Sequence, residues 1–403
     1  WNVHEESFFP KLKPLSSLTF RVSYSLTGTP PDASYCNALT KLSMNTPYRP
    51  TTTDKELGFV VAAVGNDELT YEKKHEFNFG VDAGFFNNRL NVTFDVYQRR
   101  NFDEIAPTVT QLYGTAYANV GSMKSWGEEL SISSTNVKTN DFSWQTSLIY
   151  SHNRTEITDL YNQGRVIDLV QGNGFAKQGY PARALFSIPF VGVNEKGYPV
   201  CINEKGQATV GDLNFQERDN TDYLIYEGST DPIYNGSLGN TFNYKGFHLN
   251  LFLTYAFGNV VRLDPVFKAK YNDLTSMTHD FKNRWMQPGD ENVTNVPGVV
   301  SRYEYEQNRT LLSTAYNAYN YTSVRTAKGD FIRLKEISLA YDFPHRWLEN
   351  SPVNNISLKL QATNLMLLYA DKKLNGQDPE FMNAGGVASP MPKQFTLTLK
   401  LGL

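Results

Sequence analysis

Side chains that commonly carry out catalysis are widely spaced in this chain of 403 residues. The histidines are His4, His75, His152, His248, His279 and His345. They lack the short, recurring spacings that bind a metal ion. No G-x-S-x-G sequence marks a serine nucleophile. Glu128 and Glu129 are neighbours that would point to opposite faces of a strand, so they do not form an acid/base pair. The sequence therefore predicts no catalytic residue, no metal and no cofactor, and a protein that is not an enzyme.

Aromatic side chains offer a different chemistry, the stacking of rings against a bound ligand. Tyr and Trp combine an apolar ring with a polar edge, which suits contacts with sugars or peptides in a wet cleft. They gather in two stretches, 257–328 and 366–391. Two interpretations are open. Either these stretches line a binding chamber or contact a partner protein, or the rings pack each loop on itself, which is the favoured interpretation. The candidate residues are Trp285, Tyr303, Tyr305, Tyr316, Tyr319, Tyr321, Tyr369 and Asp371.

Composition narrows the class of protein further. The net charge of −3 is too small to indicate a nucleic-acid partner. No apolar run approaches the roughly 18 residues of a membrane helix, and the longest covers 59–64. Cys36 and Cys201 define neither a disulfide scaffold nor a metal site; they predict two free thiols or, alternatively, one disulfide. No secretory signal begins at Trp1, so we expect a mature protein or a fragment.

The elements that must position these loops are strands. Apolar and polar residues alternate with period two in most of the chain, and no segment has a convincing helical pattern. About twelve strands are predicted. They cover 18–24, 77–83, 90–96, 126–132, 142–150, a weaker pair flanking 194–197, 234–244, 247–255, 329–342, 356–362 and 395–403.

Short and long connections alternate between these strands. The short ones are 85–89, 134–140, 194–197, 244–246 and 344–354. The long ones are 27–72, 98–118, 152–182, 204–232, 257–328 and 366–391. An antiparallel sheet with tight turns at one end and large loops at the other gives this pattern, as in bacterial outer-membrane barrels.

Lipid would explain both the alternation and the low mean hydropathy of −0.44. A closed sheet pairs every backbone group, presents an apolar face to lipid and keeps a polar face for the lumen. We therefore predict an all-β, antiparallel transmembrane barrel; a soluble β-sandwich or propeller is the alternative, since its strands alternate too. Aromatic residues near strand ends would form interfacial girdles. They are Tyr24, Phe85, Phe86, Tyr97, Tyr150, Tyr255 and Tyr341.

The stretch GDFIRLKEISLAYDFP (329–344) fits this picture less simply. Strict alternation places Arg333 and Lys335 on one face together with Ile337 and Leu339, so neither face is purely apolar. Two interpretations are open. The two basic residues line the lumen, or they extend toward the membrane interface from the end of the strand.

Several motifs, in this order and spacing, resemble the C-terminal half of SusC/RagA-type TonB-dependent transporters. They include YEKKHEFNFGVDAGFFNNRLNVTFDVYQRR (71–100), DPIYNGSLGNTFNYKGFHLNLFLTYAFGN (231–259), the stretch 329–344, and LQATNLMLLYADKKLNGQDPE (360–380). WNVHEESFFPKLKPLSSLTFRVSYSLTG (1–28) and SPMPKQFTLTLKLGL (389–403) resemble the segments at either end of that half. Each motif alone is weak, and their combination makes the resemblance specific.

The resemblance implies a function for the whole protein. Residues 1–403 would form about half of a roughly 22-stranded barrel in the outer membrane, without the plug domain or the first barrel half. The protein would import a glycan or an oligopeptide, with a SusD-like surface lipoprotein as a lid, energy from TonB acting on the plug, and a dimer of transporter–lipoprotein pairs. The aromatic loops would contact the ligand or the lid. Another TonB-dependent receptor, for example for siderophores, and a soluble carbohydrate-binding β protein are the alternatives.

The sequence departs from the family pattern in two places. An acidic turn of the family appears as Asp219, Asn220 and Asp222, but Tyr223 replaces the glycine that a tight calcium loop needs. A solvated acidic turn is therefore favoured over a calcium site. The chain ends in Leu403, where barrel proteins often end in an aromatic residue.

Overall fold

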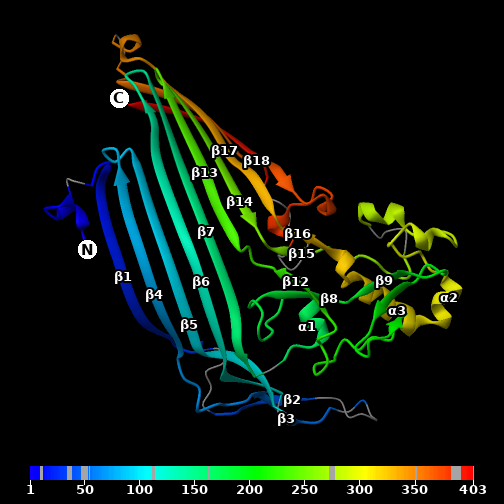
Figure 1. Ribbon diagram of the computed structural model, residues 1–403. Coiled ribbons are helices and arrows are strands. Elements are labelled where there is room, and N and C mark those ends of the chain that lie inside the picture. Colours follow the sequence, from blue (N-terminus) through cyan, green and yellow to red (C-terminus); the bar gives the residue numbers. More distant parts are fainter. Residues whose placement is uncertain are drawn as a thin grey trace.

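A single antiparallel sheet of ten long strands dominates the computed structural model (Figure 1). The structure describes residues 1–9, 12–33, 39–46, 53, 55–110, 114–161, 163–271, 277–349, 352–382 and 392–402. The sheet strands, in spatial order, are β1 (Leu15–Thr29), β4 (Glu72–Phe85), β5 (Leu90–Thr110), β6 (Gly114–Lys138), β7 (Phe142–Leu160), β13 (Tyr234–Tyr244), β14 (Phe247–Phe257), β17 (Phe331–Asp342), β18 (Asn355–Ala370) and β19 (Gln394–Gly402). All neighbours in the sheet are antiparallel, and the sheet is an open curved wall, as expected for part of a barrel.

Tight turns gather at one end of this wall, as predicted from the alternating connection lengths. Both marked chain ends lie at this end in Figure 1. Asn87 and Asn88 turn the chain between β4 and β5 with φ of 56° and 59°, which asparagine tolerates better than most residues. Lys245 and Gly246, at φ 44° and 88°, join β13 to β14 in a two-residue hairpin.

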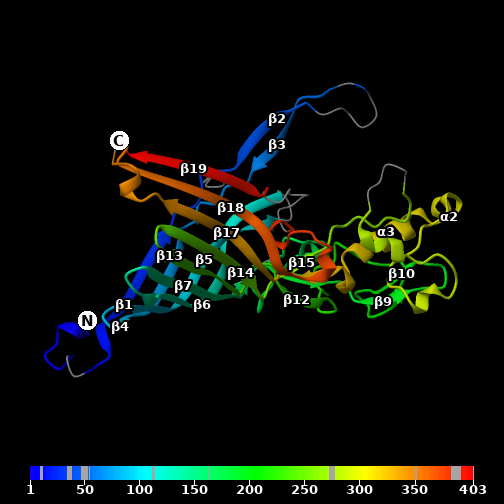
Figure 2. The ribbon, with the colours of Figure 1, turned by 90° about the horizontal axis from the view of Figure 1, so that it is seen from above.

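The long connections carry smaller elements at the other end. The β2–β3 hairpin (Lys41–Asn45, Gly58–Ala63) projects away from the wall (Figure 2). The remaining strands are β8 (Ala184–Ser187), β9 (Phe190–Val193), β10 (Pro199–Ile202), β11 (Ala208–Thr209), β12 (Ile225–Ser229), β15 (Val260–Arg262) and β16 (Thr326–Lys328). The α-helices are α1 (Val166–Val170), α2 (Arg302–Gln307) and α3 (Arg309–Asn320). Short 3-10 helices are η1 (Val3–Glu5), η3 (His279–Asn283), η4 (Asp290–Asn292), η5 (Ser323–Arg325), η6 (His345–Trp347), η7 (Lys372–Leu374) and η8 (Pro379–Phe381).

Three predictions about these elements need correction. The weak pair around 194–197 does form strands, β9 and β10, but in a separate three-stranded sheet, so the wall contains ten of the twelve predicted strands. The connections 98–118 and 152–182 are shorter than predicted because β5, β6 and β7 continue into them. Helix α3 was not predicted, although Leu312, Ala315, Tyr316 and Tyr319 recur at helical spacing and are all buried.

Cross-strand pairing sorts the residues of the wall into two chemically distinct faces. Ser338 on β17 lies opposite Asn250, which lies opposite Thr241, which lies opposite Gln145 on β7. One residue further along, Leu339 lies in the same way opposite Leu249, and the row continues through Phe242 and Trp144. One face is therefore polar and the other apolar across neighbouring strands, as expected for a barrel wall between a lumen and lipid.

A β-bulge explains the mixed pattern of 329–344. Glu336 pairs with Phe252 and Leu334 with Leu253, so Lys335 is an extra residue without a partner on β14. The bulge shifts the alternation by one residue. Leu334 therefore lies on the apolar face with Leu339, whereas Arg333 lies on the polar face. Of the two interpretations, the structure supports the lumen-facing position of Arg333.

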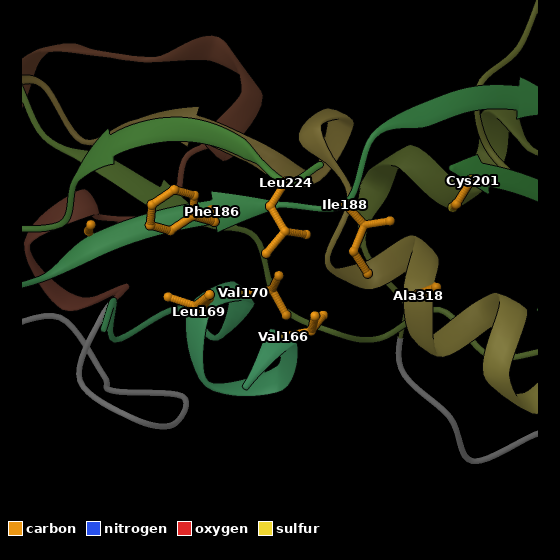
Figure 3. Packing of buried hydrophobic residues seen from close by; sticks show 9 residues of the cluster. Val166, Leu169, Val170, Phe186, Ile188, Cys201, Leu224 and Ala318 are labelled. Carbon is orange, nitrogen blue, oxygen red and sulfur yellow. The ribbon is translucent and has the colours of Figure 1, made fainter. Parts of the chain in front are cut away.

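The apolar face of the wall remains uncovered in this chain. Val22, Leu360 and Leu397 are 67%, 54% and 69% exposed. The buried clusters lie instead in the long connections (Figure 3), where α1, β8, β10 and α3 pack together. A sandwich would seal the apolar sides of its strands between two sheets. Such an extended exposed apolar surface indicates a non-aqueous environment, so the sandwich alternative is excluded.

Aromatic rings border this apolar face at both ends. At the tight-turn end, Phe247 lies 4.4 Å from Tyr341, ring centroid to centroid. At the other end, Phe257 lies 5.8 Å from Tyr255 and 6.3 Å from Tyr369. From Phe247 to Phe257 the strand rises about 34 Å. A tilt of about 40° reduces this to about 26 Å, close to the height of an outer-membrane apolar band.

The predicted girdle also contains one error. Tyr97 is 5% exposed and lies on the polar face, where its hydroxyl donates to Asn153 Oδ1 at 3.1 Å. It is therefore not a girdle residue.

None of the helices that the structure describes is long and apolar enough to cross a membrane.

Candidate functional site

The long connections between β7 and β13 and between β14 and β17 build one compact unit at the loop end of the wall. We call the described residues of 163–232 and 258–329 the loop module. Val166, Leu169 and Val170 of α1 lie against Phe186 and Ile188, and Ala318 of α3 closes the same cluster (Figure 3). This core gives the loops a fixed shape.

A buried arginine joins three segments of the module. Arg262 of β15 is 5% exposed and donates to the carbonyl oxygens of Thr322 at 2.8 Å and Phe186 at 2.6 Å. It also donates to Ser187 Oγ at 3.0 Å. Burial lowers the pKa of its guanidinium to about 10, so the group stays charged at neutral pH. Carbonyl dipoles stabilise this charge, and the nearby carboxylate of Glu227 adds to the stabilisation.

A second buried arginine, Arg325, is 3% exposed and lies in η5, shortly after α3 in the sequence. It donates to the carbonyl oxygen of Asp264 at 3.0 Å and lies 4.7 Å above the ring of Phe267. Burial lowers the pKa of its guanidinium. Neither Arg262 nor Arg325 was singled out from the sequence. The available signal was an arginine between apolar or small residues, in VVRL (260–263) and SVRTA (323–327).

Tyr316 and Tyr319, two of the predicted ligand contacts, are buried at 1% and 2% exposure. The Tyr316 hydroxyl donates to the carbonyl oxygen of Gly298, and burial raises the pKa of that hydroxyl. The ring of Tyr319 meets those of Phe190 and Phe267 edge to face, at 5.5 and 5.1 Å. Both rings hold α3 in place. For these two residues the structure favours packing of the loop on itself.

Trp285 and Tyr321 also pack inside the module. The Trp285 indole donates to Glu291 Oε2 at 3.1 Å. A Cβ on Gly197 would come within 2.4 Å of the Trp285 ring, and a Cβ on Gly298 within 2.8 Å. The ring therefore lies directly on the backbone at both glycines. Tyr321 is half-buried and contacts Phe215 edge to face at 6.2 Å.

Tyr303 and Tyr305 are the candidates that the structure leaves accessible. Tyr303 on α2 is 78% exposed. Tyr305 is half-buried and lines a cavity of about 420 Å³ whose other rings are Phe215, Phe267 and Tyr316. Polar side chains of Lys268, Lys270 and Asn317 border the same cavity. Rings combined with a few polar groups suit the binding of a sugar or a peptide side chain.

Tyr369 and Asp371 lie apart from this cavity. Tyr369 pairs with Ile332 on the apolar face and belongs to the aromatic border of the wall. Asp371 accepts the backbone N–H groups of Lys328 and Lys373, each at 2.9 Å. It therefore joins the start of η7 to the end of β16, a structural contact between the module and the last loop.

The acidic turn carries a lysine beside its carboxylates. Lys177 Nζ lies 3.0 Å from Asp222 Oδ1 and 3.1 Å from Thr221 Oγ1. Glu217 accepts the backbone N–H groups of Asp219 and Asn220 at 3.0 and 3.2 Å. Backbone hydrogen bonds lower the pKa of the Glu217 carboxyl. In the part of the chain that the structure describes, no group of three His, Cys or carboxylate residues could hold a metal ion.

The two cysteines are not equally placed. Cys201 on β10 is a free thiol, 2% exposed, and burial raises its pKa to about 12. Cys36 lies outside the described residues. The prediction of a free thiol is confirmed for Cys201.

Two arginines on the polar face of the wall each pair with two carboxylates. Arg21 bridges Asp82 at 2.7 Å and Asp95 at 3.0 Å. Arg333 is 6% exposed and lies 2.6 Å from Asp378 and 3.1 Å from Glu380. Because Asp378 and Glu380 come from the last loop, Arg333 fixes that loop over the polar face.

Comparison with known proteins agrees with this architecture. Residues 2–365 match the family model described as TonB dependent receptor-like, beta-barrel. TonB-dependent receptor P3 of Formosa agariphila is 25% identical over 94% of this chain and 37% of its own length. TonB-dependent receptor SusC of Bacteroides thetaiotaomicron is 25% identical over 100% of this chain and 39% of its own length.

A solved structure shares the fold. The structure of the RagAB peptide transporter is similar over 100% of this chain and 42% of that chain, with a TM-score of 0.75 and 24% sequence identity. This chain spans about two fifths of the length of the curated relatives that it matches.

Proposed function

This chain belongs to the family of TonB-dependent receptor β-barrels of the outer membrane, and from this premise we propose that it is the C-terminal half of a transporter that imports a glycan or an oligopeptide. The observation that carries the proposal is the ten-stranded wall with one exposed apolar face and one polar face. Such a wall needs lipid on one side and water on the other. The plug and the first half of the barrel would belong to the rest of the polypeptide, and TonB would act on the plug.

The loop module supports a role in capture of the nutrient. Its core fixes a cavity of about 420 Å³ with aromatic and polar walls, which suits rings and amides better than a bare ion. We assign Tyr305 to ligand contact in this cavity and Tyr303 to contact with a lid. Trp285, Tyr316, Tyr319 and Tyr321 would position these surfaces from within the module.

Exposed apolar side chains on the module support a protein lid. Such residues together favour a protein partner over bulk water. A SusD-like surface lipoprotein would cover them, and two transporter–lipoprotein pairs would form the complete assembly. The exposed residues are Met286, Val293, Val299, Tyr303 and Leu311.

A deletion within the loop module distinguishes the role of the wall from the role of the module. Arg262 and Thr326 are partners across β15 and β16, so a two-residue Asn-Gly turn can join them in place of residues 263–325. In the full-length protein we expect normal insertion, seen as a heat-modifiable band in outer-membrane fractions, and no uptake of the cognate nutrient. Normal growth of the deletion strain on that nutrient would contradict the proposal.

The alternative within the family is a siderophore receptor. Affinity purification of the full-length protein from native membranes distinguishes the two. Recovery of a stoichiometric surface lipoprotein supports a lidded nutrient importer, and the deletion should abolish that recovery. Recovery of the transporter alone, together with growth that depends on it only under iron limitation, would support the siderophore alternative.

A further inference from the structure

A second cavity, of about 730 Å³, lies on the polar face where β13, β14 and β17 meet the loops. Its floor includes Ser237 and Thr254, which are cross-strand partners on that face. Its rim includes Asn259, Lys335 and Glu380 from three different segments. The cavity therefore opens toward the lumen, on the side of the wall that a nutrient would pass.

Lys335 differs from the other charged residues around this cavity. Arg183 pairs with Asp231 at 2.8 Å, and Glu380 pairs with Arg333 at 3.1 Å. No described residue forms an ion pair with Lys335. The bulge makes Lys335 the unpaired residue of β17, and its half-buried side chain lines the cavity. Lys335 thus has no carboxylate of the described residues within ion-pair distance.

An unpaired hydrogen-bond acceptor lies in the same cavity. Asn259 is 7% exposed, and its Oδ1 accepts no hydrogen bond in the described structure. A Cβ on Gly329 would come within 2.2 Å of Asn259 Nδ2, so the glycine makes room for this amide beside it. A buried acceptor without a donor is costly, and a ligand N–H or O–H would satisfy it.

We propose that this cavity is a subsite for a carboxylate of the transported nutrient, with Lys335 as the counter-charge and Asn259 Oδ1 as acceptor for a neighbouring N–H or O–H. The proposal rests on the import function proposed above and adds a chemical class of ligand to it. An acidic peptide and an acidic oligosaccharide both present a carboxylate close to such a donor. The bulge places the ammonium group where strict alternation would have turned it away from the lumen.

The test uses the full-length transporter, purified in detergent and exposed to two mixtures. One is a casein digest, and the other contains neutral and uronate-bearing oligosaccharides. Bound compounds are eluted and quantified by mass spectrometry. The wild-type protein should enrich carboxylate-rich compounds from one mixture, which identifies the source. Lys335→Met should reduce that enrichment about tenfold to a hundredfold, the effect of losing one charge-assisted contact.

Two further variants make the result specific. Lys372→Met removes a charge from an exposed residue outside the cavity and should behave as wild type. Lys335→Glu should shift the bound compounds toward those that carry cations, a change that a purely structural role would not produce. Heat-modifiability of each variant shows that the barrel is folded.

Three results would overturn the subsite. They are enrichment of neutral compounds only, no effect of Lys335→Met, or an equal loss of neutral and acidic compounds in that variant. In all three the import proposal would stand, because the wild-type protein still binds compounds from a mixture. If the wild-type protein retained nothing from either mixture and cells showed no uptake, the import proposal itself would fail.

Discussion

Replacing Arg262 by methionine should loosen the loop module without affecting the wall. The variant loses three hydrogen bonds and leaves the carbonyl oxygens of Phe186 and Thr322 without this donor. A hydrogen bond to a charged group contributes about 1.5–3 kcal/mol, and a buried group left unpaired costs about 1–3 kcal/mol. Part of this loss is offset because the variant no longer buries a charge. Methionine also keeps the packing of the apolar part of the side chain. We expect a net destabilisation of the module of about 3–5 kcal/mol, estimated from the lost hydrogen bonds.

Hydrogen–deuterium exchange on the purified full-length protein measures this effect region by region. Local opening should become about a hundredfold to a few thousandfold more frequent, so amides of β8, β15 and η5 should exchange faster by that factor. Exchange of the amides of β13 and β14 should be unchanged. Arg262 forms no hydrogen bond or ion pair with the described residues of the wall, and the wall strands are held by their own backbone hydrogen bonds.

Arg183→Met is the matched control. Arg183 pairs with Asp231 at 2.8 Å, but both side chains are about half exposed, so its loss should cost less than about 1 kcal/mol. If Arg262→Met left exchange in β8 and β15 at the wild-type rate, the buried guanidinium would not be what joins these segments, and the reasoning would be refuted.

The remaining predictions concern single side chains of the module. In a Cys36→Ser background, Cys201 should resist maleimide at pH 8 in the native protein and react after denaturation, because the thiol is buried and its pKa is raised to about 12; rapid native labelling would contradict its burial. Tyr316→Phe should lower the stability of the module by about 1–2 kcal/mol, since the carbonyl oxygen of Gly298 loses its donor. Tyr303→Phe should have no such effect, because Tyr303 is 78% exposed. Equal amide exchange rates near α3 in the two variants would contradict the structural role of the Tyr316 hydroxyl.

Most strands of the wall could be predicted from the sequence, because one physical rule determines their pattern of apolar and polar residues. A strand between lipid and water must alternate, and β19 and residues 77–85 of β4 do so without interruption. The rule fails at Lys335, where the bulge shifts the alternation and separates Arg333 from Ile337 and Leu339. No residue type in IRLKEI specifies a bulge, so its position depends on pairing with β14 and could not be derived locally.

The candidate site was only partly predictable, for a different reason. Aromatic residues pointed to the loop that lines the cavity at Tyr305, but ring chemistry alone does not distinguish a ligand contact from a core residue. The helical spacing of Leu312, Ala315, Tyr316 and Tyr319 is the sequence signal for the buried face of α3. The cavity at Lys335 and Asn259 brings together residues 76 positions apart in the chain, and only the folded sheet places them together.

The central claim is that lipid covers the apolar face of the wall, and β18 offers the most direct test. Nitroxide labels at Leu358→Cys and Leu360→Cys, in the Cys36→Ser protein reconstituted in bilayers, report collisions with oxygen from the lipid. Labels at Lys359→Cys and Gln361→Cys report collisions with a water-soluble nickel complex from the lumen. If lipid covers this face, collision rates should alternate with period two, with oxygen dominant at the two leucine positions. Labels at Leu358 and Leu360 that neither agent reaches would show that protein covers this face, and would contradict the account.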